Sequence, residues 1–203
     1  MSREAIEAGS ANTIGQGQDT GLEEIADARL RAIFDANFVF IWRSLRRLGV
    51  PEASVDDAAQ EVFIIATRKL SRIQEGRERS FLYSTARRVA SGCRRASRRE
   101  AAAVEAVDVQ SVPDSRPGPD DAVDQQQARK LLDAVLAEMS LDIRSVFVLF
   151  ELEGMSMAEI AAMLDVAPGT VASRLRRARE LFHRLVGRLE EQGLSDGRPT
   201  ASS

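Results

Sequence analysis

The stretch MAEIAAMLDVAPGTVASRLRRARE, residues 157–180, has the pattern of two helices separated by a short break. Ser156 and Glu159 have the spacing of a capping box, in which each side chain bonds the backbone N–H of the other residue. The segment APG, 167–169, interrupts the pattern, and Pro168 suits the first position of the next helix. A short helix, a tight break and a second helix together predict a helix-turn-helix.

The second of these helices has two chemically different faces. Its apolar residues fall within roughly 80° of the helical wheel and are predicted to pack against the rest of the motif. They are Val171, Leu175, Ala178, Phe182 and Leu185. The residues predicted to face DNA are Thr170, Ala172, Ser173, Arg174, Arg176 and Arg177. Because arginine can bind guanine O6 and N7 in a major groove, this helix favours a DNA reader over a plain helical hairpin.

A second basic helix is predicted around RRVASGCRRASRR, residues 87–99, which holds six arginines and no acid. On a helical wheel the arginines fall within roughly 140°, opposite an apolar stripe that includes Val89 and Cys93. Helices that merely face solvent usually mix both signs of charge, since like charges one turn apart repel. The arginine face therefore favours a nucleic-acid partner over simple solvation.

The whole chain is predicted to be all-α, with two small helical domains joined by a flexible acidic linker. The linker carries six acids, one arginine, three prolines and no aromatic residue, so it cannot bury enough surface to fold alone. The expected segments are a disordered N-terminus (1–24), a helical bundle (25–100), the linker (101–128), the helix-turn-helix domain (129–189) and a disordered tail (190–203).

Composition narrows the function classes. The 203 residues carry a net charge of −3 and contain no apolar run long enough to span a membrane, which together with the absence of a signal-like start predicts a cytoplasmic protein. One cysteine, Cys93, and one histidine, His183, predict neither a disulfide nor a metal site. No cofactor and no enzyme activity are expected, because no phosphate loop or nucleophile–base pair is visible. Cys93 is predicted to be a core residue, although nearby arginines could instead lower its pKa and make it redox-sensitive.

Three motifs resemble the extracytoplasmic-function (ECF) subfamily of bacterial RNA polymerase sigma factors. DDAAQEVFI (56–64) resembles the core-binding helix of sigma factors, and SFLYSTARRVASGCRR (80–95) resembles the helix that follows it. Residues 139–179 resemble the DNA-binding domain at the C-terminus of that subfamily. The resemblance implies a transcription initiation factor that binds the beta and beta' subunits of core RNA polymerase and promoter DNA. Such factors are often held inactive by an anti-sigma factor.

The resemblance also implies a role for individual residues. The expected contacts with core polymerase are Asp56, Asp57, Gln60, Glu61 and Phe63. The expected contacts with the −10 element are Phe81, Tyr83, Arg87, Arg88, Arg94, Arg95 and Arg98. Phe81 and Tyr83 could stack on unpaired bases, with core packing as the alternative for Phe81. The −35 element is expected to meet the second helix of the helix-turn-helix through the six residues given above.

A rival hypothesis is a helix-turn-helix regulator whose N-terminal half senses a signal. The C-terminal half alone permits this interpretation. The polar residues Asp57, Gln60 and Glu61 argue against it, because their spacing places them on one exposed face that is typical of a docking surface.

Overall fold

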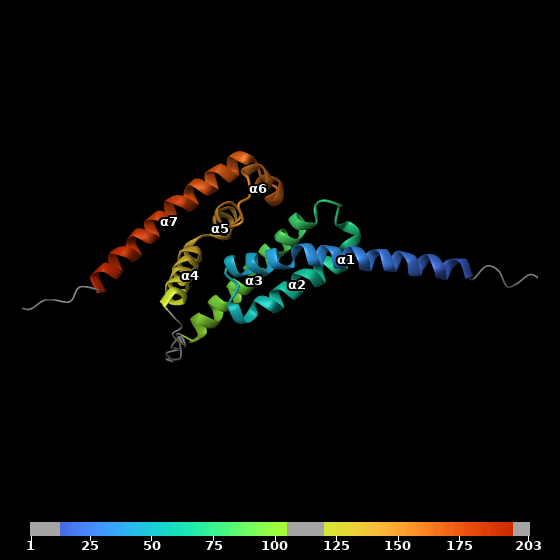
Figure 1. Ribbon diagram of the computed structural model, residues 1–203, viewed down its shortest axis with the longest axis horizontal. Helices are drawn as coiled ribbons and strands as arrows, with labels where there is room; N and C mark the ends of the chain where they lie inside the picture. The colour runs from blue at the N-terminus through green and yellow to red at the C-terminus, as the bar shows by residue number, and fades with distance from the viewer. Residues whose placement is uncertain (1–12, 105–119, 197–203) are drawn as a thin grey trace, which may run out of the picture.

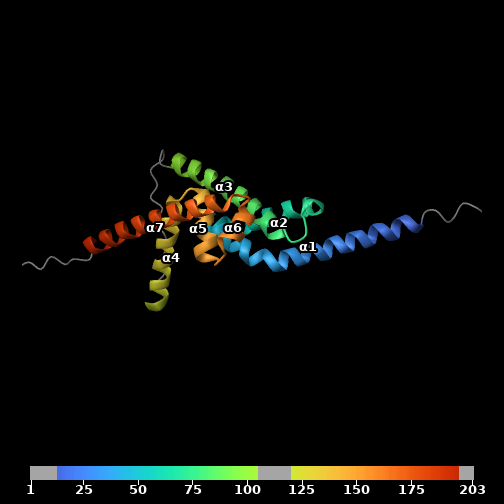
Figure 2. The ribbon, with the colours of Figure 1, turned by 90° about the horizontal axis from the view of Figure 1, so that it is seen from above.

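The structure is a computed structural model that describes residues 13–104 and 120–196, and within these ranges its regular elements are all helical. This confirms the predicted all-α fold. The N-terminal unit contains α1 (Thr13–Arg47), α2 (Val55–Arg68) and α3 (Glu78–Val104). The C-terminal unit contains α4 (Asp120–Glu138), α5 (Leu141–Phe147), a π-helical turn η3 (Val148–Leu152), α6 (Met157–Leu164) and α7 (Pro168–Asp196). The start of α1 and the end of α7 extend from the body in opposite directions (Figures 1 and 2).

The core of the N-terminal unit forms where α2 and α3 pack against the C-terminal half of α1. Ile41, Leu45 and Leu48 recur at helical spacing and are fully buried. Phe34 lies on the same apolar side of α1 but remains 42% exposed. Its ring packs at the edge of the core, with its centroid 4.8 Å from that of Phe63.

The turn between α1 and α2 depends on a glycine. Gly49 has φ of +95°, a conformation that costs other residues free energy. A 3₁₀ turn, η1 (Glu52–Ser54), then leads into α2. Ser54 and Asp57 have the spacing of a capping box, but the Ser54 side chain makes no capping hydrogen bond where the 3₁₀ turn continues directly into the helix.

Four helix ends differ from the expected segment boundaries. α1 begins at Thr13, within the segment expected to be disordered, and α7 continues to Asp196. The expected linker 101–128 contains the last turn of α3 and the first half of α4, while residues 1–12, 105–119 and 197–203 lie outside the described part of the chain. Extending a helix that is already nucleated costs little, so a polar segment can continue it.

The helix-turn-helix forms as its local pattern predicts. The Ser156 hydroxyl accepts from the Glu159 backbone N–H, and the Glu159 carboxylate accepts from the Ser156 N–H at 2.8 Å. These bonds from Ser156 hold the pKa of Glu159 below its usual value. Asp165 adopts the left-handed conformation with φ of +53° and ends α6, and α7 begins at Pro168. The break between the helices is thus residues 165–167 rather than the expected 167–169.

The two units pack against each other in addition to being joined by the linker. One apolar cluster contains the N-terminal core together with Val146, Leu149, Ile160, Met163 and Val171 of the C-terminal unit. A separate cluster lies inside the C-terminal unit and includes buried residues of α4, α5 and α7. The contact between the units brings α6 against α3 (Figure 1) and places Arg144 of α5 beside Gly49, just after the end of α1. We call this packing the closed arrangement.

Candidate polymerase and nucleic-acid interfaces

One face of α2 is polar and open to solvent. We call it the α2 polar face, and it consists of Asp56, Asp57, Gln60 and Glu61, all of them exposed. Most apolar residues of α2 turn inward, although Ile64 is 41% exposed, and the α2 polar face is free for a partner. Phe63 departs from the expectation: it is only 7% exposed, because the helical period places it among the core-facing residues. It therefore cannot act as a docking residue in this arrangement.

The α2 polar face has a support that the motif analysis missed. Trp42 on α1 donates its indole N–H to the Asp56 carboxylate at 2.7 Å. This bond orients Asp56 and ties the start of α2 to α1. The available signal was that Trp42 is the single tryptophan of the chain and lies beside the apolar stripe of α1.

The arginine face of α3 is only partly free. Arg88, Arg95 and Arg98 are exposed, as the helical wheel predicts. Arg87 and Arg94 are half-buried, and their neighbours include residues of the C-terminal unit. The closed arrangement therefore covers part of the surface on which the sequence places promoter contacts.

The two aromatic residues expected to stack on unpaired bases lie in different environments. Tyr83 is fully buried, with its ring centroid 5.8 Å from that of Phe40, and burial raises the pKa of its hydroxyl. Stacking of Tyr83 on a base is therefore incompatible with this arrangement, because the side chain belongs to the core. Phe81 is half-buried and packs against the core cluster, in line with the alternative interpretation of that residue.

Cys93 lines a groove of about 600 Å³ between α2 and α3, together with Glu61 and Arg88. It is half-buried and packs against the core cluster. Burial, assisted by the charge of Glu61, raises the pKa of the Cys93 thiol. The nearby arginines therefore do not produce the low-pKa thiolate of a redox sensor. No group of His, Cys, Asp and Glu side chains in the described ranges is arranged to hold a metal ion.

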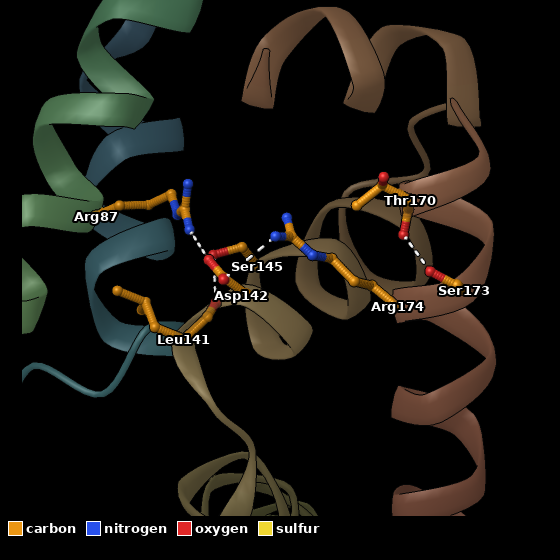
Figure 3. A network of polar contacts seen from close by, with 7 residues as sticks. All are labelled: Arg87, Leu141, Asp142, Ser145, Thr170, Ser173 and Arg174. Carbon is orange, nitrogen blue, oxygen red and sulfur yellow. Dashed lines mark hydrogen bonds and ion pairs between the residues drawn. The ribbon is translucent and has the colours of Figure 1, made fainter. Parts of the chain in front are cut away.

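The start of α7 presents a compact polar surface. Its exposed members are Ala172, Ser173, Arg176 and Arg177, which we call the reading face of α7. Arg176 also forms an ion pair with Glu180 at 2.8 Å, one turn along the helix. Thr170 is half-buried, and its carbonyl accepts from the Ser173 hydroxyl at 3.0 Å (Figure 3). Val171, Leu175 and Ala178 are buried, as predicted.

A single carboxylate links the two basic helices. Asp142 of α5 accepts from Arg87 of α3 and, at 3.2 Å, from Arg174 of α7 (Figure 3). The first arginine was expected at the −10 element and the second at the −35 element. In the closed arrangement both are held by one acid of the protein itself.

A second acid fixes the C-terminal unit to α1. Glu153 accepts from Arg43 at 2.8 Å and also from Arg47, and its side chain is only 4% exposed. Sequence reasoning missed both Asp142 and Glu153. Neither residue breaks the local helical pattern, so only the packing of the two units shows that each of them forms ion pairs between the units.

Comparisons with known proteins identify the family of the chain. Residues 33–100 match the sigma-70 region 2 family, and residues 129–182 match the family of sigma-70, region 4. The ECF RNA polymerase sigma-E factor of Escherichia coli K12 is 34% identical over 146 residues, which span 68% of this chain and 76% of that protein. The chain belongs to the ECF RNA polymerase sigma factors.

Further relatives support the same assignment. The ECF sigma factor SigL of Mycobacterium tuberculosis is 32% identical over 154 residues, covering 74% of this chain and 85% of SigL. Two solved structures share the fold at 23% identity: CnrH bound to the cytosolic domain of CnrY, and RpoE of Bartonella quintana bound to NepR. Their TM-scores are 0.59 and 0.58, and the matches cover 79% and 77% of this chain and 89% and 96% of those chains.

As an ECF sigma factor, the chain binds core RNA polymerase and directs promoter recognition and transcription initiation. Region 2 comprises the C-terminal part of α1, together with α2 and α3 up to residue 100, and region 4 runs from within α4 into α7. Among the described residues, no helix is both long enough and apolar enough to cross a membrane.

Proposed function

We propose that the α2 polar face is the docking surface for core RNA polymerase. Its side chains share one exposed side of a rigid helix, and the bond from Trp42 fixes the orientation of Asp56. Fixed carboxylates lose little side-chain entropy on binding, which favours specific contact with a basic partner. The clamp formed by the beta and beta' subunits is the partner we assign to this face.

The arginine face of α3 is assigned to the −10 element. Its side chains suit contacts with backbone phosphates, which position the protein on the duplex without reading sequence. Tyr83 is not among the proposed contacts with the −10 element because it is buried. Phe81 is half-buried, so its position is compatible with base stacking and with core packing.

The reading face of α7 is assigned to the −35 element. Arg176 and Arg177 lie in the N-terminal half of α7, the part of a recognition helix that enters the major groove. Arg174 and Thr170 flank this face and suit phosphate contacts.

The central part of this proposal rests on the ion pairs that Asp142 forms with Arg87 and Arg174. Arg87 and Arg174 contact the same carboxylate, so their guanidinium groups are immediate neighbours. The −10 and −35 elements lie about 25 base pairs apart, which is about 85 Å of duplex at 3.4 Å per step. One duplex therefore cannot place both elements on these helices in the closed arrangement. We infer that the two units must separate when the chain engages a promoter.

A neutral residue at Asp142 tests this inference. Asp142→Asn removes the ion pair with Arg87, which exists only in the closed arrangement, and one exposed pair contributes about 0.2–1 kcal/mol. We expect the complex of this variant with core polymerase to bind promoter DNA about 1.4- to 5-fold more tightly than the wild type does. The promoter is first obtained by transcribing a pool of genomic fragments with core polymerase and the purified chain.

The matched control is Asp35→Asn, which removes one exposed negative charge from α1. Both variants change the net charge equally, so a general electrostatic effect would increase DNA affinity in both. Equal affinity of the Asp142→Asn and Asp35→Asn complexes for the promoter would contradict a closed arrangement that opposes DNA binding.

Three further assignments complete the proposal. Sigma factors are regulators without catalytic activity, and we infer that this chain likewise has no enzymatic role of its own. Its place of action is the cytoplasm, where core polymerase is found. An anti-sigma factor is a third proposed partner, because RpoE of Bartonella quintana, which shares the fold, is solved in complex with the anti-sigma factor NepR.

A further inference from the structure

A basic cleft lies where the two units meet. It has a volume of about 430 Å³ and runs between the second half of α3 and the junction of α4 with α5. Arg94, Arg95, Arg98 and Ser91 line it from the side of α3, and residues 137–141 line it from the other unit. In the part of the chain that the structure describes, no carboxylate forms an ion pair with any of these three arginines, although Glu138 lies in the cleft wall.

A fourth arginine is buried beside this cleft. Arg144 of α5 is only 2% exposed, and its Nε and Nη2 atoms lack hydrogen-bond partners. Its Nη1 atom and the Arg94 Cδ atom lie 2.3 Å and 3.4 Å from the point where a Cβ on Gly49 would stand. The two arginines therefore meet directly above Gly49.

The charges of these arginines oppose one another. Burial, followed by the repulsion of Arg94, lowers the pKa of Arg144 to about 10, while Asp133 acts in the opposite direction. Burial and the charge of Arg98 likewise lower the pKa of Arg94. Arg144 therefore remains charged at neutral pH. A buried guanidinium with unmet donors and like-charged neighbours is costly unless an anion completes the site.

We propose that this cleft binds a pyrophosphate group, either as free inorganic pyrophosphate or as the diphosphate of a nucleotide. Two linked phosphates bring several negative charges and many acceptor oxygens to a site where guanidinium groups converge. The cleft volume accommodates the diphosphate and leaves an attached nucleoside at the open side. The site shares Arg94, Arg95 and Arg98 with the proposed promoter contacts, but the other part of its wall belongs to α4, α5 and the residues that join them.

Binding at this cleft has a consequence for promoter recognition. The walls come together only in the closed arrangement, so an anion that bridges them favours that arrangement over the separated one. By linkage, pyrophosphate and promoter DNA then weaken each other's binding. This consequence rests on the proposed separation of the two units, whereas binding of the anion to the free chain does not.

Calorimetric titration of the purified full-length chain with inorganic pyrophosphate and, separately, with ADP tests the site. We expect one pyrophosphate to bind per chain, and tighter binding of ADP would assign the site to a nucleotide. Arg144→Met should weaken binding at least tenfold, the loss expected for about one charge-assisted contact. Arg72→Ala, which removes an exposed arginine outside the cleft, should bind like the wild type. Thermal melting of each variant verifies that it is folded.

The variant Asp142→Asn distinguishes binding in the proposed cleft from general electrostatic attraction of pyrophosphate to arginines. It removes a negative charge close to the cleft, so simple electrostatics would make pyrophosphate bind more tightly. Loss of the ion pair with Arg87 instead makes the closed arrangement less favourable, so we expect no gain in affinity and a loss of up to about 5-fold. Tighter binding by this variant, wild-type affinity in Arg144→Met, or no binding to the wild-type chain would overturn the proposal. Because the titration contains neither polymerase nor DNA, its failure would leave the proposed function untouched.

Discussion

A chain carrying both Asp57→Arg and Glu61→Arg is expected to bind core RNA polymerase at least about 30-fold more weakly than the wild type. Hot-spot residues of an interface contribute about 2 kcal/mol or more, and charge reversal adds repulsion to the lost contacts. Both residues are exposed on α2, so their replacement leaves the apolar core intact.

Competition with labelled wild-type chain for core polymerase measures this affinity directly. The matched control is Asp35→Arg, which reverses an exposed acid on α1 outside the α2 polar face. The control should compete like the wild type, and both variants should melt at the wild-type temperature. If the double variant competed as well as the wild type, the α2 polar face would not be the docking surface for core polymerase.

Replacing both Arg176 and Arg177 by alanine is expected to abolish selective promoter use. Each bidentate contact of an arginine with guanine contributes about 1–3 kcal/mol of discrimination, so the pair corresponds to about 30-fold to 10⁴-fold. The loss should concern recognition of the −35 element, while the affinity for core polymerase stays unchanged. Both side chains are exposed, and the buried residues of α7 remain in place.

The control for this pair is Arg184→Ala, an exposed arginine farther along α7 that lies outside the reading face. Run-off transcription on the natural promoter and on one with a scrambled −35 element provides the comparison. The double variant should transcribe both templates equally poorly, whereas the control should retain the wild-type preference. A preserved preference in the double variant would show that other residues read the −35 element.

The features that follow from local chemistry could be predicted from the sequence. The capping box at Ser156 and Glu159, the start of α7 at Pro168 and the burial of Val171 all depend on residues within a few turns of one another. The arginine face of α3 follows in the same way from the helical period. The exposure of the α2 polar face also agrees with its spacing, although its polymerase partner remains a proposal.

The features that depend on packing between the two units could not be predicted. Asp142, Arg144 and Glu153 are ordinary charged residues within helical patterns, and nothing nearby in the sequence indicates that they meet α1 and α3. Tyr83 was mistaken for a surface residue for a related reason. Motif resemblance assigned it a role in base stacking, whereas the helical period decides its burial.

The central claim is that the two units separate when the chain engages a promoter. Fluorescence energy transfer between labels at Ala53→Cys and His183→Cys, in a Cys93→Ser background, measures this separation. Both label positions are exposed, one in η1 and the other on α7. We predict efficient transfer in the free chain and a clear decrease when core polymerase and promoter DNA are added. Unchanged transfer in a complex that initiates RNA from that promoter would contradict the claim.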